Sequence, residues 1–130
     1  TAYNHHNQIA VMSHIMLPGV APAKENTKKT RYAVNAITEL ITLYKLDRSS
    51  EEIIAVCIAG GANVLQKTDD CIGQNVIDSI EEILKNKEIK VVARSLGGTQ
   101  RRSVSFDVET GNVHCSIGDG ADEFFWNFSG

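Results

Sequence analysis

Apolar residues recur along the first half of the chain with the periods of strands and of helices. Residues 8–17 (QIAVMSHIML) carry apolar side chains on both alternating faces, which predicts a strand lying between two layers. Apolar positions at helical spacing predict an amphipathic helix over about 30–46. Residues 52–59 (EIIAVCIA) form the most apolar run and predict a central, fully buried strand.

The second half of the chain continues with one more helix and then changes to strands. A helix is expected over about 76–86 and a strand over 90–94. Residues 103–108 and 112–117 alternate between apolar and polar side chains around a turn at 109–111, which predicts a hairpin. The order β-α-β-α-β-β-β favours a layered α/β/β sandwich of mixed strands with two main helices.

Composition and charge restrict the class of protein. The chain has 130 residues, 42% hydrophobic, and a net charge of −3. This size predicts a single domain, taken as residues 1–120, and the charge gives no basic footprint for nucleic acid or anionic membranes. No apolar run approaches the roughly 20 residues that span a bilayer, so we expect no membrane insertion. Three cysteines without CxxC spacing fit a reduced, cytoplasmic protein and indicate no metal and no cofactor.

His14 is the most unusual residue of the predicted strands. It shares a face with Met12 and Met16, so a neutral histidine of the core is the simpler interpretation. The alternative is a general base, because a partner and partial burial can hold an imidazole pKa near neutrality. Ser13 points to the opposite face of the strand.

Two glycine clusters are candidate site elements. Gly60 and Gly61 follow one predicted strand, and Gly97, Gly98 and Thr99 follow another. Such glycines form tight turns or let a ligand approach the backbone closely, and the pattern alone leaves both open. Cys57 is expected to be an inert core thiol.

Residues 121–130 (ADEFFWNFSG) form an aromatic tail after the last predicted strand. One interpretation is that its rings fold back over the core of the domain. The other is that they form an exposed segment that binds a partner.

Several short motifs occur in order over about residues 9–117: SHIMLPG, RYAVNAI, AGGAN, IGQNV, LGGTQRR and FDVETGNV. In this set and order the chain resembles the chemoreceptor glutamine deamidase family, CheD. The resemblance implies a hydrolase that converts glutamine to glutamate on the cytoplasmic helices of methyl-accepting chemotaxis receptors. It also implies methyl-ester hydrolysis there, and binding to CheC, a phosphatase whose activity the family raises.

The resemblance assigns His14 as the catalytic histidine of a cysteine–histidine mechanism. It places Ser13 and the glycine clusters around the site. The family's nucleophile lies in a Gly-Ser-Cys motif shortly before this strand, and no such motif occurs in the chain. We therefore expect the cysteine to lie upstream of Thr1. The alternative is a non-catalytic binding module that regulates a CheC-type phosphatase. Arg101 stands where the family usually has glycine, whereas Arg102 matches its pattern.

Overall fold

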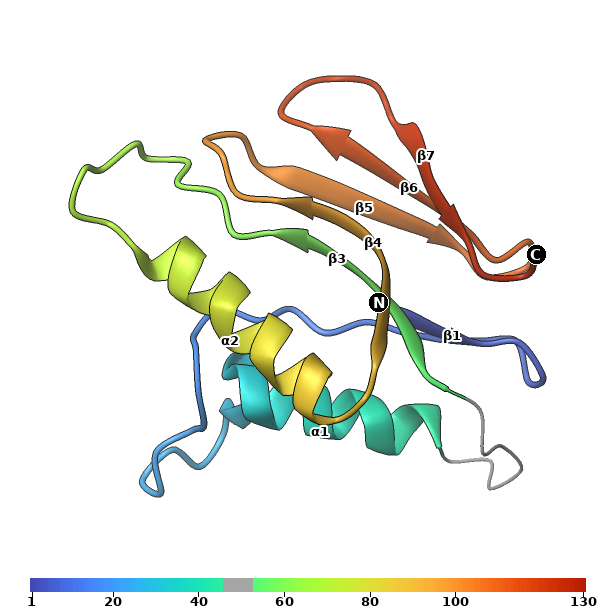
Figure 1. The fold of residues 1–130 in the computed structure, drawn as a ribbon, viewed down its shortest axis with the longest axis horizontal. Coiled ribbons are helices and arrows are strands. Elements are labelled where there is room, and N and C mark those ends of the chain that lie inside the picture. The colour runs from blue at the N-terminus through green and yellow to red at the C-terminus, as the bar shows by residue number, and fades with distance from the viewer. Residues whose placement is uncertain (46–52) are drawn as a thin grey trace.

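The computed structural model describes residues 1–45 and 53–130. Figure 1 shows their order along the chain. The elements are β1 (Ala2–Asn4), β2 (Ile9–Val11), the 3-10 turn η1 (Lys29–Arg31), α1 (Ala33–Tyr44), β3 (Ala55–Gly60), α2 (Ile72–Asn86), β4 (Lys90–Leu96), β5 (Arg102–Asp107), β6 (Asn112–Ile117) and β7 (Glu123–Asn127).

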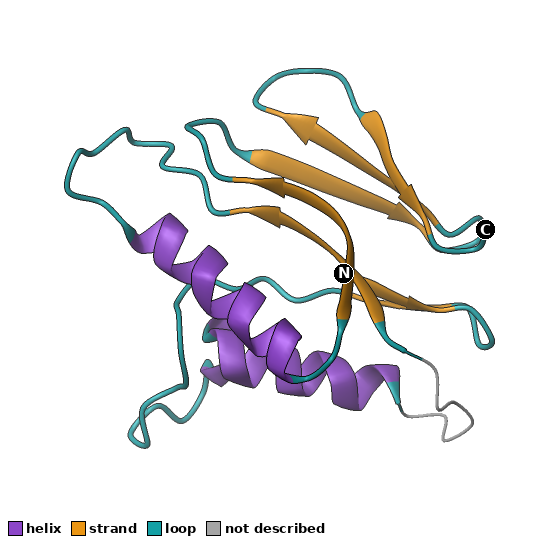
Figure 2. Ribbon diagram, in the orientation of Figure 1, coloured by secondary structure: helices purple, strands orange, loops and turns teal. Residues whose placement is uncertain are grey.

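The elements form three layers, as predicted. One sheet has the order β2-β1-β3-β4, with β3 and β4 parallel and the other pairs antiparallel. The second sheet is antiparallel with the order β5-β6-β7. Both helices lie on one side of the first sheet and the second sheet lies on the other side (Figure 2). The layered α/β/β class is therefore confirmed.

The main core lies between the helices and the four-stranded sheet. Its buried members come from both helices, from β1, β2 and β3, and from the residues just before β3 and β4: Ala2, Val11, Ile37, Leu40, Tyr44, Ile54, Val56, Leu84 and Ile89. Burying a large aliphatic side chain contributes about 1.5–3 kcal/mol, so this cluster supplies much of the driving force for the fold.

Tyr3 connects the two sheets. Only 5% of its surface is exposed, and its ring packs against Phe106 and Phe128 at centroid distances of 5.4 and 6.3 Å. Its hydroxyl donates a hydrogen bond of 2.9 Å to the carbonyl of Val108 at the end of β5. The short strand β1 is thereby fixed between the layers.

The strand predicted over 8–17 is shorter in the structure. Only Ile9–Val11 pairs with a neighbour, and the chain then runs to an isolated bridge between Leu17 and Tyr32. Because β2 is the edge strand of its sheet, no further strand in the described part of the chain lies beside residues 12–16. The pattern also did not identify β1, which contains only three residues. Residue 52, the first of the predicted central strand, lies outside the described residues.

The second helix begins earlier than predicted. It starts at Ile72, whose backbone N–H donates to the carboxylate of Asp70 at 3.0 Å. The N–H of Asn75 donates to the carbonyl of Cys71, so Asn75 lies inside the first turn and does not cap the helix. The start predicted at about residue 76 is therefore too late, and α2 includes Ile72 and Gly73 before it.

The aromatic end of the chain contains a strand that the pattern did not identify. β7 pairs with β6 and completes the second sheet. Phe125 and Phe128 are partly buried, whereas Phe124 is 66% exposed. The rings that fold back over the domain are therefore Phe125 and Phe128, whereas the ring of Phe124 is exposed. Two hairpin residues expected to face inward, Val108 and Ile117, are 42% and 46% exposed because they lie at strand ends.

Candidate functional site

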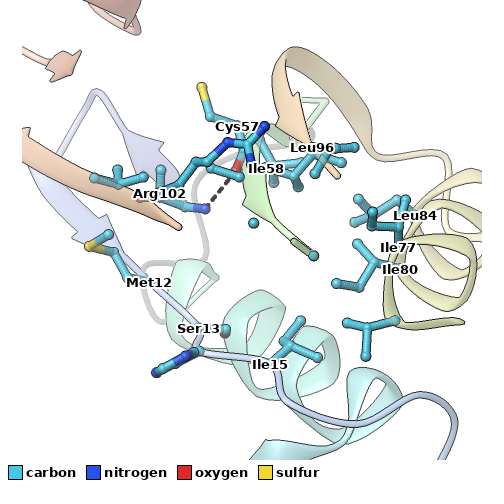
Figure 3. Close-up of a pocket in the computed structure, with 18 of the residues that line it drawn as sticks. Met12, Ser13, Ile15, Cys57, Ile58, Ile77, Ile80, Leu84, Leu96 and Arg102 are labelled. Carbon is cyan, nitrogen blue, oxygen red and sulfur yellow. Dashed lines mark hydrogen bonds between the residues drawn. The ribbon is translucent and has the colours of Figure 1, made fainter. Parts of the chain in front are cut away.

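A cavity of about 540 Å³ lies between the two helices and the strands of both sheets. Most of its wall is apolar, as Figure 3 shows for the side chains of α2 that face β3 across it. The principal apolar residues of this wall are Ile37, Leu40, Ile58, Ile77, Ile80 and Leu84. The lining also contains Thr1, Ser13, His14 and Arg102, and it contains no aspartate or glutamate.

His14 lies at this cavity and is exposed. The chain alternates here, so that Met12, His14 and Met16 are exposed while Ser13 and Ile15 are partly buried. The interpretation of His14 as a core histidine is therefore wrong, because no element among the described residues covers this face of the segment. Within the described residues the imidazole makes no hydrogen bond, so both ring nitrogens are accessible to a reacting group.

Ser13 also lines the cavity but is held by the neighbouring helix. Its hydroxyl donates to the carbonyl of Ala36 in α1 at 3.3 Å. The opposite orientation of Ser13 and His14 agrees with their alternation along an extended chain. Ser13 therefore positions the segment that carries His14.

Thr1 brings the first position of the chain to the cavity wall. Its backbone nitrogen donates a hydrogen bond of 2.8 Å to the carbonyl of Cys57 in β3, and its hydroxyl donates to the carbonyl of Val11 at 3.0 Å. Position 1, just before β1, and position 14, just after β2, thus line the same cavity.

The cysteines of the chain do not supply a nucleophile at this place. Cys57 is 2% exposed, and burial raises the pKa of its thiol to about 11, so it is protonated at neutral pH. Its expected role as an inert core thiol fits this environment. Cys71 is exposed and lies before α2, outside the cavity lining, and Cys115 is buried in β6.

The two glycine clusters lie side by side. Gly60 and Gly61 line the cavity, and the N–H of Gly97 donates to the carbonyl of Gly60 at 2.9 Å. Gly98 accepts a hydrogen bond from the backbone of the loop after Gly61, whereas Thr99 is exposed. Gly97, Gly98 and Thr99 do not line the cavity, but the hydrogen bonds of Gly97 and Gly98 support the turn at Gly60 and Gly61, which does.

Gly61 is required by close packing against α2. Its φ is +69°, and a Cβ atom there would lie 2.5 Å from Cγ1 and Cδ1 of Ile77. The backbone of Gly61 also approaches Gly73 so closely that a Cβ on Gly73 would overlap the Gly61 carbonyl. This pair of glycines sets the spacing between the end of β3 and the first turn of α2.

Arg102 is a lining residue that the sequence analysis did not assign to the site. Its Nη1 donates to the carbonyls of Gly97 and Gln100, and its Nε donates to the hydroxyl of Ser95 at 3.1 Å. One signal was present in the sequence: Arg102 alternates with Val104, so both share the inner face of β5.

Over residues 1–45 and 53–130, no group of three histidine, cysteine or acidic side chains could hold a metal ion. In the same residues no helix combines the length and apolarity needed to cross a membrane.

Residues 16–117 match the protein family described as CheD chemotactic sensory transduction. The chain belongs to the CheD family. The resemblance seen in its motifs is thereby confirmed. One CheD relative is a "Probable chemoreceptor glutamine deamidase CheD" of Chlorobium luteolum, 27% identical over 127 residues that cover 98% of this chain and 63% of the relative.

Two further CheD relatives show similar identity. The "Chemoreceptor glutamine deamidase CheD" of Thermotoga maritima is 30% identical over 106 residues, covering 82% of this chain and 66% of the relative. A probable CheD of Clostridium botulinum strain Eklund 17B is 29% identical over 119 residues, covering 88% of this chain and 74% of the relative. The chain thus spans about two thirds of the length of these proteins.

Proposed function

We propose that this CheD chain is part of a protein-glutamine deamidase that converts glutamine to glutamate on chemotaxis receptors. The relatives bear the name chemoreceptor glutamine deamidase. The observation that carries the proposal is the convergence of position 1 and an exposed His14 on one cavity. A cysteine shortly before Thr1 would be within reach of this place.

In the proposed reaction His14 is the general base. It takes the proton from the thiol, and the thiolate attacks the side-chain amide carbon of the substrate glutamine. The imidazolium returns a proton to the departing ammonia, and water then hydrolyses the thioester with His14 again as base. Backbone N–H groups of the Gly60–Gly61 turn are our candidates for stabilising the oxyanion, since these residues line the cavity. A methyl ester at the same position would react by the same steps.

The surroundings of His14 suit a macromolecular substrate. Met12 and Met16 flank it on the same face and are 56% and 51% exposed. Methionine side chains are flexible and polarizable, so they adapt to the surface of a bound helix. We propose that receptor helices bind across this face. A CheC-type phosphatase is proposed as a further partner, and the cytoplasm as the location, because the receptor helices lie there.

Ammonia release tests the proposal. The chain extended upstream through the expected Gly-Ser-Cys motif is incubated with a receptor cytoplasmic fragment, and a Cys→Ser variant of the same extended chain is the matched control. Ammonia is expected from the cysteine protein and at most at background level from the serine protein. Binding of the fragment or of a CheC-type phosphatase, with no ammonia release although the cysteine is present, would favour the binding module instead.

A further inference from the structure

The polar part of the cavity lining can carry positive charge and no negative charge. Arg102 and His14 line the cavity, and no acidic residue does. The remaining wall is mostly aliphatic. A ligand with an apolar arm and an anionic end would match this arrangement, because attraction between charges strengthens where apolar walls exclude water.

Arg102 differs from the other arginines that the structure describes. Arg31, Arg94 and Arg101 each form an ion pair, with Glu25 at 3.5 Å, with Glu81 at 2.7 Å and with Asp119 at 2.7 Å, respectively. Arg102 has no acidic partner within the described part of the chain, and its hydrogen-bond acceptors there are two carbonyls and one hydroxyl, all neutral.

These hydrogen bonds fix the Arg102 guanidinium and leave one nitrogen available. Nε and Nη1 are engaged, whereas Nη2 donates to no acceptor among the described residues. In Figure 3 the Arg102 side chain lies on the side of the cavity where Cys57 and Leu96 also lie. A guanidinium held in this way loses little conformational freedom when it binds an anion.

We propose that Arg102 binds a carboxylate in the cavity, and that this carboxylate is the glutamate side chain formed by the reaction. The identity of the ligand as product rests on the proposed deamidase function, whereas carboxylate binding itself does not. Glutamine offers the same aliphatic arm without the charge, so the site retains product over substrate. Arg102 thereby makes the enzyme sensitive to inhibition by its product.

An isosteric pair of probes tests carboxylate binding directly. Binding of 4-methylpentanoate and of 4-methylpentanamide to the chain is measured by NMR titration. A hydrogen bond to a charged group is worth about 1.5–3 kcal/mol, so the carboxylate is expected to bind about tenfold more tightly or better. This preference should vanish in Arg102→Gln, persist in part in Arg102→Lys, and remain unchanged in Arg101→Gln, whose side chain lies outside the cavity lining.

Two controls keep the result specific. Arg102 also holds the turn after β4, so folding of each variant is checked by near-UV circular dichroism. If Arg102→Gln does not fold, Arg102→Lys decides, with salt dependence as its readout: raising salt from about 0.02 to about 0.5 M should weaken the remaining preference.

The outcomes separate this inference from the proposed function. Equal affinities for the two probes, or a preference unchanged in folded Arg102 variants, would overturn carboxylate binding, whatever the ammonia assay shows. Receptor peptides then identify the source of the carboxylate. Arg102-dependent binding is expected for a peptide with glutamate at the reacting position. If Arg102-dependent binding occurs only with a peptide whose glutamate lies beside the reacting position, the assignment of the carboxylate as product is overturned.

Discussion

Replacing Gly61 by alanine tests the packing that shapes the cavity. At φ +69° an alanine occupies the left-handed region, which costs about 1–2 kcal/mol. The new Cβ would also lie 2.5 Å from two carbons of Ile77 and 3.2 Å from the carbonyl of Gly73. Overpacking of this kind costs about 1–3 kcal/mol, so we expect a total loss of about 2–5 kcal/mol. This is a large part of the stability of an ordinary domain.

Gly98→Ala is the matched control for the backbone contribution. Gly98 has nearly the same φ, +71°, but a Cβ there would meet nothing within 4 Å. Urea unfolding of both variants should therefore show Gly98→Ala destabilised by only about 1–2 kcal/mol. The difference between the two variants measures the contact with α2.

The double variant Gly61→Ala/Ile77→Ala separates the contact from other effects. Removing Cγ1 and Cδ1 of Ile77 should relieve most of the overpacking, so the double variant should be about 1–3 kcal/mol more stable than the sum of the single losses. Additive losses, or equal losses for Gly61→Ala and Gly98→Ala, would refute this account of the turn.

Three further predictions concern the cysteines, the hairpin and the junction of the sheets. A thiol reagent at pH 8 should modify exposed Cys71 rapidly and Cys57 only on unfolding, because burial raises the pKa of Cys57 to about 11; rapid loss of two thiols from folded protein would contradict this. Hydrogen bonds from the backbone N–H and side chain of Thr110, and from the backbone N–H of Glu109, lower the pKa of Asp107. As the pH falls, the Asp107 carboxylate is therefore protonated in the unfolded protein before it is protonated in the folded protein. Its stabilising effect should be complete above about pH 4–5 and decline as the pH falls further, and Asp107→Asn should flatten this part of the pH–stability curve measured by urea unfolding. Tyr3→Phe removes the hydroxyl that bonds the end of β5 and should cost about 0.5–1.5 kcal/mol in the same assay, whereas an unchanged stability would show that this hydrogen bond contributes nothing.

The α/β/β layer class could be predicted from the sequence because regularly spaced apolar residues mark the face of a helix or strand that is buried. The two helices and the β5–β6 hairpin carry enough periodic apolar residues to indicate both their type and their buried face. The strand over 52–59 was predicted from an unbroken apolar run as fully buried, which is wrong in part: Ile53 is 75% exposed and Ala59 in β3 is exposed. β1 has only three residues and owes its place to Tyr3, whose partners lie more than a hundred residues away. No local pattern can report such a contact.

The sequence identified the candidate residue His14 but did not predict the surroundings of the site. Apolar neighbours made His14 look buried, but its side chain is exposed, and no strand in residues 1–45 and 53–130 lies beside residues 12–16. Arg102 was missed because a single arginine near a turn is usually a solvated side chain. Its place depends on a pairing of β5 and β6 that turns it, together with Val104, toward the cavity.

The rate of glutamine deamidation with and without the His14 imidazole tests the central claim most directly. The upstream-extended chain, its His14→Ala variant and its His114→Ala variant are each incubated with a receptor fragment, and conversion of glutamine to glutamate is followed by mass spectrometry. A general base contributes about 10²–10⁴-fold, so His14→Ala should lose activity by that factor while His114→Ala keeps it. Full activity in a folded His14→Ala protein would contradict the mechanism.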